Sequence, residues 1–176
     1  TELFSKKGSK VFYNQPPPQG WVTAELLNYY YVSLETVMLR RSTIQSLEMV
    51  FDPEISHASD FDLILRTSTI SKLKYVPKLL AKWRVHKDSG TWQTGEVFII
   101  DKKKLILKYE KSHLFSPYQK ELCKLKNDTE IQWALYLLIS NQKDKAKNTL
   151  KTIKLINRKA FCNFWNLNPP ILNIFC

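Results

Sequence analysis

The chain has 176 residues, of which 44% are hydrophobic and 12% aromatic, and its net charge is +11. This apolar content suffices for one ordinary domain, or for a compact half with a helical appendage, and excludes a disordered chain. No apolar run reaches the roughly 18–20 residues of a membrane span, and nothing resembles a signal peptide. Cys123, Cys162 and Cys176 lack metal-ligand spacing, which favours reduced thiols in a cytoplasmic setting.

The positive charge lies mainly in the second half of the sequence. Residues 1–90 hold 12 Lys and Arg against 9 Asp and Glu, whereas residues 91–176 hold 15 against 7. This excess indicates either an anionic neighbour, such as a membrane surface, a polyphosphate or a nucleic acid, or a solvated lysine-rich surface. The aromatic residues follow core-like spacing and do not alternate with the lysines as stacking platforms, so we expect no nucleic-acid partner.

Hydrophobic periodicity predicts short elements up to residue 92. In chain order, we expect a proline-containing loop over 1–20, a helix over 21–31 capped by Thr23, a strand over 32–41, a short helix over 42–49, a helix over 59–71, and one bent strand or two short strands over 72–85. Pro53 ends the short helix because proline disfavours helical geometry in the residue before it. Pro77 marks a strand edge or a bulge.

Longer helices are expected after residue 92. They cover residues 97–109, 118–140 and 143–157, and a turn at Asn141 joins the last two into a helical hairpin. Lys102–Lys104 should point outward from the first of these helices. The sequence therefore predicts an α/β part, residues 1–92, followed by an all-α extension, residues 93–176.

Asp60 and Asp62 lie at the start of the helix predicted over 59–71, where Ser59 and Asp62 resemble a capping box. One interpretation of Asp60 is that the helix dipole stabilises a carboxylate in the first turn by about 0.3–1 kcal/mol. The other is that Asp60 projects into a cleft and accepts a proton as a general base. Asp62 points away from Asp60 on a helix, and it should either cap the helix or pair with Arg66, four residues later.

A polar cluster follows the strand segment that ends near residue 85. Arg84 and His86 are succeeded by Ser89 and Thr91. Such a histidine can ligate a divalent metal ion or contact a phosphate, and it can equally be a surface residue in a polar loop. With only 4 glycines, the chain has little material for a phosphate-cradling loop.

Five segments share their order and spacing with one known family. They are Gly20-Trp-Val-Thr-Ala-Glu-Leu-Leu, Val37-Met-Leu-Arg-Arg, Phe51-Asp-Pro-Glu, Ser59-Asp-Phe-Asp-Leu-Ile-Leu-Arg66, and Tyr75-Val-Pro-Lys-Leu-Leu-Ala-Lys-Trp-Arg-Val-His86-Lys-Asp-Ser89. Together they resemble the C-terminal half of a family-2 glycosyltransferase of the GT-A fold. The segment that begins at Asn141 resembles the helical hairpin that many such enzymes carry after the catalytic domain. Each motif is weak alone, but the ordered set spans nearly the whole chain.

The resemblance implies part of an inverting enzyme that moves a sugar from a nucleotide-sugar donor to a glycan or lipid-linked acceptor. It implies that Asp60 is the general base, that His86 contacts the metal or the donor diphosphate, and that Arg84 flanks the same site. Ser59 departs from the family pattern, which commonly has an acidic residue directly before the base. In this family the donor and its Mg²⁺ or Mn²⁺ are held by a D-x-D motif, which does not precede Asp60 here.

We therefore expect a piece of a longer cytoplasmic protein, inactive alone, whose metal ion is held mainly by residues outside these 176. The alternative is a non-catalytic GT-A remnant that binds an anionic membrane or a partner protein through its basic helical tail. In that case the protein would lie peripherally at the cytoplasmic membrane.

Overall fold

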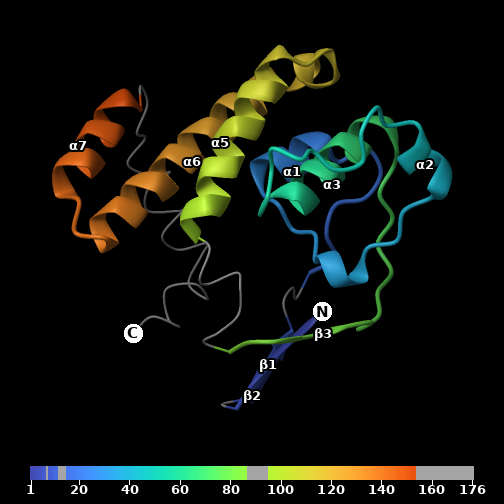
Figure 1. Cartoon of the computed structure of the whole chain (residues 1–176). Coiled ribbons are helices and arrows are strands. Elements are labelled where there is room, and N and C mark those ends of the chain that lie inside the picture. Colours follow the sequence, from blue (N-terminus) through green and yellow to red (C-terminus); the bar gives the residue numbers. More distant parts are fainter. Residues whose placement is uncertain (7, 12–14, 87–94, 154–176) are drawn as a thin grey trace. The chain divides into compact units, whose positions relative to one another are not determined.

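The computed structural model describes residues 1–6, 8–11, 15–86 and 95–153 (Figure 1). Its elements are β1 (Glu2–Ser5), β2 (Gly8–Val11), α1 (Thr23–Asn28), the 3-10 helix η1 (Leu34–Thr36), α2 (Arg41–Gln45), α3 (Ser59–Ile70), β3 (Lys82–Arg84), α5 (Gly95–Lys111), the 3-10 helix η2 (His113–Tyr118), α6 (Gln119–Ile139) and α7 (Lys143–Thr152). The class is α/β, with a small mixed sheet and a mostly helical remainder. This confirms the predicted class at that level.

The chain divides into two compact units, Thr1–Thr129 and Glu130–Cys176. This division differs from the one expected at residue 92, because α5 contributes Leu105 and Ile106 to the same buried core as α3. Within the described ranges, no helix is both long enough and apolar enough to cross a bilayer.

The sheet has the strand order β2-β1-β3. β1 pairs antiparallel with β2, in a register that places Glu2 opposite Val11, and parallel with β3, which places Phe4 opposite Arg84. The prediction of a loop over residues 1–20 was therefore wrong for its first half. Gly8 has a φ of +135°, a conformation that glycine adopts without a Cβ penalty, and it begins the second strand of this hairpin.

The strand predicted over residues 32–41 was also wrong. Ser33 is instead the N-cap of η1, and its carbonyl accepts hydrogen bonds from both the N–H and the hydroxyl of Thr36 at 3.0 and 2.8 Å. Val37 and Arg40 then have extended backbone angles, but no strand of the described chain pairs with this segment. Apolar alternation alone does not form a strand when the neighbouring strand is missing.

The first unit has one hydrophobic core, built mainly from α1, α3, α5 and η2. Its largest fully buried side chains include Leu26, Leu27, Leu65, Leu105 and Phe115. α3 matches the helix predicted over 59–71, and its buried residues include Phe61, Ile64, Leu65 and Ser68. α1 is shorter than predicted, and its N-cap is Val22, so that Thr23 lies inside the helix and is buried.

A buried polar network joins α3 to α5. Asp62 accepts hydrogen bonds from Arg66 Nη2 at 2.6 Å and from the Tyr109 hydroxyl at 2.9 Å. This confirms the predicted Asp62–Arg66 pair and corrects the predicted capping box, because Ala58 is the N-cap and no side chain caps the helix. Arg66 Nη2 also donates to the Val50 carbonyl at 2.8 Å, which attaches the preceding loop to α3.

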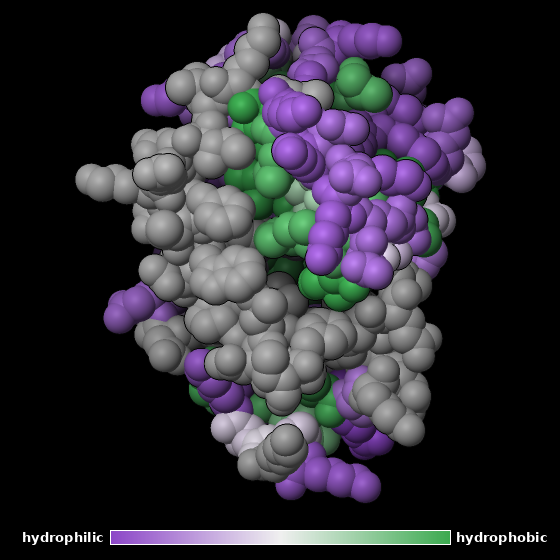
Figure 2. Space-filling view, turned by 90° about the vertical axis from the view of Figure 1, so that its left-hand side faces the viewer, coloured by the Kyte–Doolittle hydropathy of each residue, from purple (hydrophilic) through white to green (hydrophobic). Residues whose placement is uncertain are grey.

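The second unit contains a helical hairpin, as the sequence predicts. The turn at Asn141 has a φ of +58°, and the Gln142 N–H donates to the Leu137 carbonyl at 2.8 Å. Ala146 of α7 packs against Ala134 and Leu137 of α6. α7 ends at Thr152, and the last four residues of the predicted helix lie outside the described ranges. On the face drawn in Figure 2, hydrophilic side chains border exposed hydrophobic ones.

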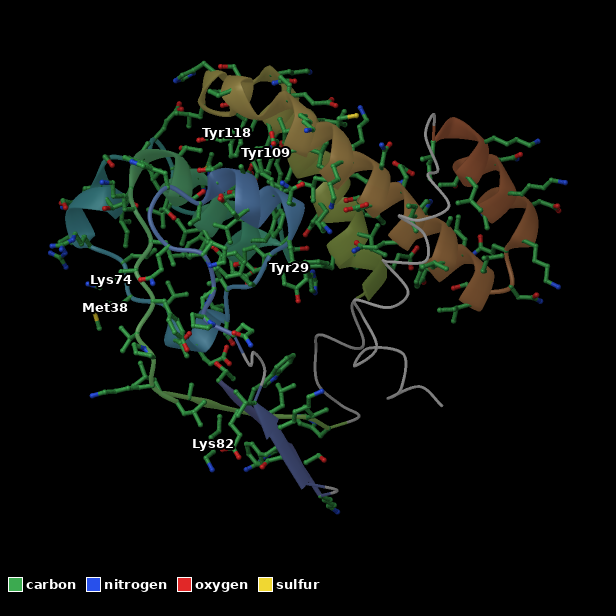
Figure 3. The ribbon with its side chains drawn as sticks, turned by 180° about the vertical axis from the view of Figure 1, so that it is seen from behind. Tyr29, Met38, Lys74, Lys82, Tyr109 and Tyr118 are labelled. Atoms are coloured by element: carbon green, nitrogen blue, oxygen red, sulfur yellow. The ribbon has the colours of Figure 1, made fainter. Side chains whose placement is uncertain are left out.

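Tyr109→Phe should lower the free energy of unfolding by about 1–2 kcal/mol, because the buried Asp62 carboxylate would lose a hydrogen-bond donor. Urea unfolding followed by circular dichroism measures the change. Tyr118→Phe is the matched control, since no hydrogen bond of the Tyr118 hydroxyl occurs within the described part of the chain. Figure 3 labels both tyrosines. Equal losses in the two variants would contradict a stabilising role for the Asp62–Tyr109 bond.

Candidate functional site

Asp60 lies in the first turn of α3 and is half-buried. Neither an ion pair nor a side-chain hydrogen bond engages its carboxylate in the part of the chain that the structure describes. Tyr30 is close enough for the charge of Asp60 to act on it. Burial, with a further contribution from Asp60, raises the pKa of Tyr30 well above its usual range. Asp60 is therefore an uncompensated carboxylate beside a phenol that stays protonated.

Tyr30 is a residue that sequence reasoning missed. Its ring packs on Phe61 with the two centroids 5.0 Å apart, and its hydroxyl is buried without a hydrogen-bond partner among the described residues. Such an unsatisfied group is costly and uncommon in a folded protein. Tyr30 belongs to the run Tyr29-Tyr30-Tyr31, which the helical pattern of residues 21–31 does not distinguish from ordinary core residues.

The segment that precedes Asp60, here called the approach loop (residues 51–58), is attached to α5 by a buried carboxylate. The backbone N–H groups of Ser56 and His57 donate to Asp101 Oδ2 at 2.9 and 2.7 Å. Burial raises the pKa of Asp101, but these amide hydrogen bonds and the charge of Lys104 outweigh it and leave the pKa below its ordinary value. The Asp101 carboxylate therefore holds one end of the approach loop, at Ser56 and His57.

The other end of the approach loop is attached to α5 by Lys108. Its ammonium group contacts the carboxylates of both Asp52 and Glu54, the latter at 2.7 Å. The hydrogen bond from Lys108 is the main reason that the pKa of Asp52 lies below its ordinary value. Asp52 Oδ1 also accepts a hydrogen bond from the Glu54 N–H at 2.9 Å. The Phe51-Asp-Pro-Glu motif thus has a structural role, holding the chain that leads into α3.

Asp62 does not share the environment of Asp60. It is 3% exposed and is neutralised by Arg66, whereas Asp60 is half-buried and lacks such a partner in the described chain. As the sequence predicts, the two carboxylates do not form a paired acid–base site. Of the two, only Asp60 is available to an incoming hydroxyl.

Arg84 and His86 belong to a different part of the first unit. Arg84 is exposed on β3, and its guanidinium carbon lies 5.6 Å from the centroid of the Phe4 ring. His86 is exposed just beyond that strand. β3 pairs with β1, whereas α3 packs against α1, α2 and η2. Ser89 and Thr91, the other members of the predicted polar cluster, lie outside the described residues.

The described residues do not supply a metal site. Across residues 1–6, 8–11, 15–86 and 95–153, no group of three or more His, Cys, Asp or Glu side chains could hold an ion. His86 alone does not fit Mg²⁺ or Mn²⁺, which prefer several oxygen ligands. We therefore assign no catalytic step to a metal ion held by these residues.

The first unit also contains a broad groove that the sequence did not reveal. Its volume is about 700 Å³, and Asp60 is not among the residues that line it. The groove is bordered by residues 31–40, by the end of α3 and by residues 71–80. Figure 3 labels Met38 and Lys74, which line it from two of these segments.

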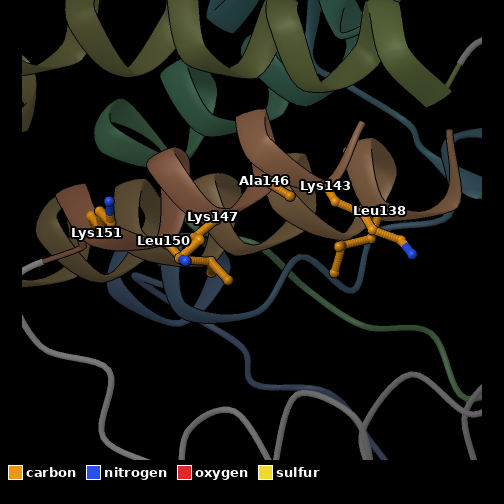
Figure 4. A pocket seen from close by; sticks show the side chains of 6 residues that line it. All are labelled: Leu138, Lys143, Ala146, Lys147, Leu150 and Lys151. Atoms are coloured by element: carbon orange, nitrogen blue, oxygen red, sulfur yellow. The ribbon is translucent and has the colours of Figure 1, made fainter. Parts of the chain in front are cut away.

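A smaller pocket lies in the second unit, on the helical hairpin (Figure 4). It has a volume of about 360 Å³ and is lined by Leu138, Lys143, Ala146, Lys147, Leu150 and Lys151. Lys143, Lys147 and Lys151 are spaced four residues apart and therefore lie on one side of α7. The remaining lining residues of the pocket are apolar.

Comparisons with protein-family models, with curated proteins and with solved structures found no match to this chain. A functional assignment therefore rests on the residues and on their geometry.

Lys102 corrects the prediction that residues 102–104 all point outward. It is 7% exposed, and its ammonium group lies over the rings of Phe61 and Phe98, 5.7 and 5.8 Å from their centroids. Burial lowers the pKa of Lys102 to about 8. The alternating pattern of α5 did not reveal this lysine because a long aliphatic stem can be buried along apolar surface.

Lys102→Met should raise the free energy of unfolding at pH 7 by on the order of 2 kcal/mol, because the native protein no longer buries a charge. In the wild type, the folded state loses the proton near pH 8 and the unfolded state only near its ordinary pKa. Wild-type stability should therefore rise between about pH 8 and 10. Urea unfolding at pH 7 and 9.5 should show a smaller difference between variant and wild type at the higher pH.

Lys111→Met is the control for this titration, because it removes an exposed lysine at the end of the same helix. A Lys102→Met variant that is less stable than the wild type at pH 7 would show that the aromatic contacts outweigh the cost of burial.

Proposed function

We propose that this chain is the acceptor-side part of an inverting glycosyltransferase, with Asp60 as the general base. The observation that carries the proposal is a half-buried carboxylate at a helix start, without a neutralising partner in the described chain. It follows an approach loop that α5 holds in place. The ordered resemblance of five segments to family-2 enzymes of the GT-A fold supports the same conclusion.

In the proposed reaction the acceptor hydroxyl attacks the anomeric carbon of the donor sugar. The Asp60 carboxylate takes the hydroxyl proton as the new C–O bond forms. The bond from the anomeric carbon to the nucleoside diphosphate breaks, and its electron pair leaves with the diphosphate. Attack from the opposite side inverts the configuration at that carbon.

The surroundings of Asp60 suit a base that must be positioned closely. A general base works only when it lies within about 2.6–3.2 Å of the group it deprotonates. The contacts of Asp101 and Lys108 with the approach loop restrict the movement of the chain that enters α3. Tyr30, whose raised pKa keeps it protonated, does not add a second negative charge near the Asp60 carboxylate.

Arg84 and His86 would contact the diphosphate of the nucleotide sugar, since a guanidinium group binds such an anion through paired hydrogen bonds. Both residues are exposed and lie at the border of the described residues. The Mg²⁺ or Mn²⁺ ion expected for the family would neutralise the leaving diphosphate, and its ligands would come mainly from outside this chain.

Asp60→Asn should lower sugar transfer by about 100- to 10,000-fold, because an amide cannot accept the acceptor proton. The assay is nucleoside diphosphate release by the complete gene product with a panel of nucleotide sugars and acceptors. Asp144→Asn is the matched control: Asp144 is exposed in the first turn of α7, so it loses the same favourable contact with a helix dipole. Activity within tenfold of the wild type in the Asp60 variant would show that Asp60 is not the base.

A second candidate function has its own observation, at the tip of the helical hairpin. Ile139 is 80% exposed and Leu138 is 44% exposed at the end of α6. On α7, the lysines at 143, 147 and 151 line the same pocket as Leu138 (Figure 4). Exposed apolar side chains flanked by lysines are typical of a surface that lies against an anionic membrane.

Lys143→Glu/Lys147→Glu should abolish sedimentation of the complete chain with anionic phosphatidylglycerol vesicles at low salt, since each lysine near such a surface adds attraction. Neutral phosphatidylcholine vesicles should not bind the wild type. Lys111→Glu/Lys120→Glu, which changes the net charge equally at exposed positions elsewhere, is the control. Equal loss in the control would assign the binding to overall charge, and no wild-type binding would exclude the membrane function.

A further inference from the structure

The groove of the first unit combines exposed apolar side chains in unusual number. Met38 is 95% exposed, and Trp21, Leu79 and Leu80 are 58%, 59% and 61% exposed. Scattered exposed apolar residues are normal, but these four line one hollow. Its volume of about 700 Å³ lies within the range of about 300–1,000 Å³ that is usual for ligand pockets.

The charged side chains of the groove all have the same sign. They are Arg40, Lys72, Lys74 and Lys78, and neither Asp nor Glu is present among the described residues that line it. The Lys72 ammonium group lies 5.9 Å from the centre of the Trp21 ring, so cationic and apolar surface meet within the groove. A ligand that satisfies this surface must carry both an apolar body and a negative charge.

We propose that the groove binds an anionic amphiphile, a lipid with an apolar chain and a phosphate or diphosphate headgroup. The chain would lie over Trp21, Met38, Leu79 and Leu80, where it removes apolar surface from water. The headgroup would be held by the four cations. The inference rests on the proposed function, and it makes the acceptor of that transferase a lipid-linked one.

Other ligand classes match only part of this surface. Inorganic phosphate or a free nucleotide sugar would leave the apolar side chains in water, and a neutral lipid would leave the cations without counter-charge. A polypeptide strand could pair with the chain near Val37 and Arg40, whose backbone is extended, since unpaired strand edges accept such additions. Pairing of a strand through its backbone would not require the four cations of the groove. The charge pattern therefore favours the anionic amphiphile.

The test is titration calorimetry of the complete chain with hexadecyl phosphate below its critical micelle concentration. Hexadecanol and inorganic phosphate serve as the apolar and the anionic half-ligands, and neither should bind measurably. Lys72→Glu/Lys74→Glu should weaken binding of hexadecyl phosphate at least tenfold, and so should Met38→Asp. Lys111→Glu/Lys120→Glu, outside the groove, should bind as the wild type does.

Several results would overturn the inference. They are no binding by the wild type, equal weakening in the control, and equal binding of hexadecyltrimethylammonium, whose charge is opposite. Concentration-dependent dimerisation that Met38→Asp abolishes, without amphiphile binding, would instead assign the groove to a polypeptide strand. Met38 is almost fully exposed, so its replacement should not unfold the chain.

Asp60→Asn separates this inference from the proposed function. Asp60 does not line the groove, so the variant should bind hexadecyl phosphate as tightly as the wild type. If the variant keeps both transfer activity and amphiphile binding, the general-base proposal fails and the binding site stands. If the variant loses transfer while the wild type does not bind the amphiphile, the general base stands and the lipid site fails.

Discussion

The attachment of the approach loop to α5 and α3 is the constraint on which the rest of the first unit depends. Two buried carboxylates contribute to it: Asp101 accepts hydrogen bonds from the backbone amides of the loop, and Asp62 joins α3 to α5 by accepting a hydrogen bond from Tyr109. A buried carboxylate is tolerated only when hydrogen bonds and opposite charges replace water. Because each of these two has its partners, the loop, α3 and α5 form one connected frame.

This frame explains why Asp60 differs from its neighbours. Arg66 is oriented toward Asp62 and the loop carbonyls, and Lys108 is engaged by Asp52 and Glu54, so these nearby cations have other partners. Asp60 lies in the first turn of α3, where backbone N–H groups and the dipole stabilise an anion. A carboxylate can accept a proton from a ligand when it is held in place but is not neutralised by a cation.

The spacing of residues in the sequence predicted those parts of the structure that depend on interactions between residues close together in the chain. Three of the long helices, the hairpin turn at Asn141 and the Asp62–Arg66 pair follow from periodicities of three to four residues. The β1–β2 hairpin and the missing strand at residues 32–41 depend on which strands find partners, and sequence spacing does not contain that information. Tyr30, Lys102 and the groove depend on packing between distant segments, so the candidate site was only partly predictable.

The groove and Asp60 are two places where the described fold leaves interactions incomplete. Elsewhere the buried carboxylates Asp62 and Asp101 of the first unit each have a cationic partner, as a stable domain requires. Leaving Met38 in water and Asp60 without a counter-charge contributes nothing to that stability. Proteins tolerate such local departures mainly where a ligand completes the surface. The same reasoning applies to both features, and it favours an acceptor that has a hydroxyl for Asp60 and an anionic lipid portion for the groove.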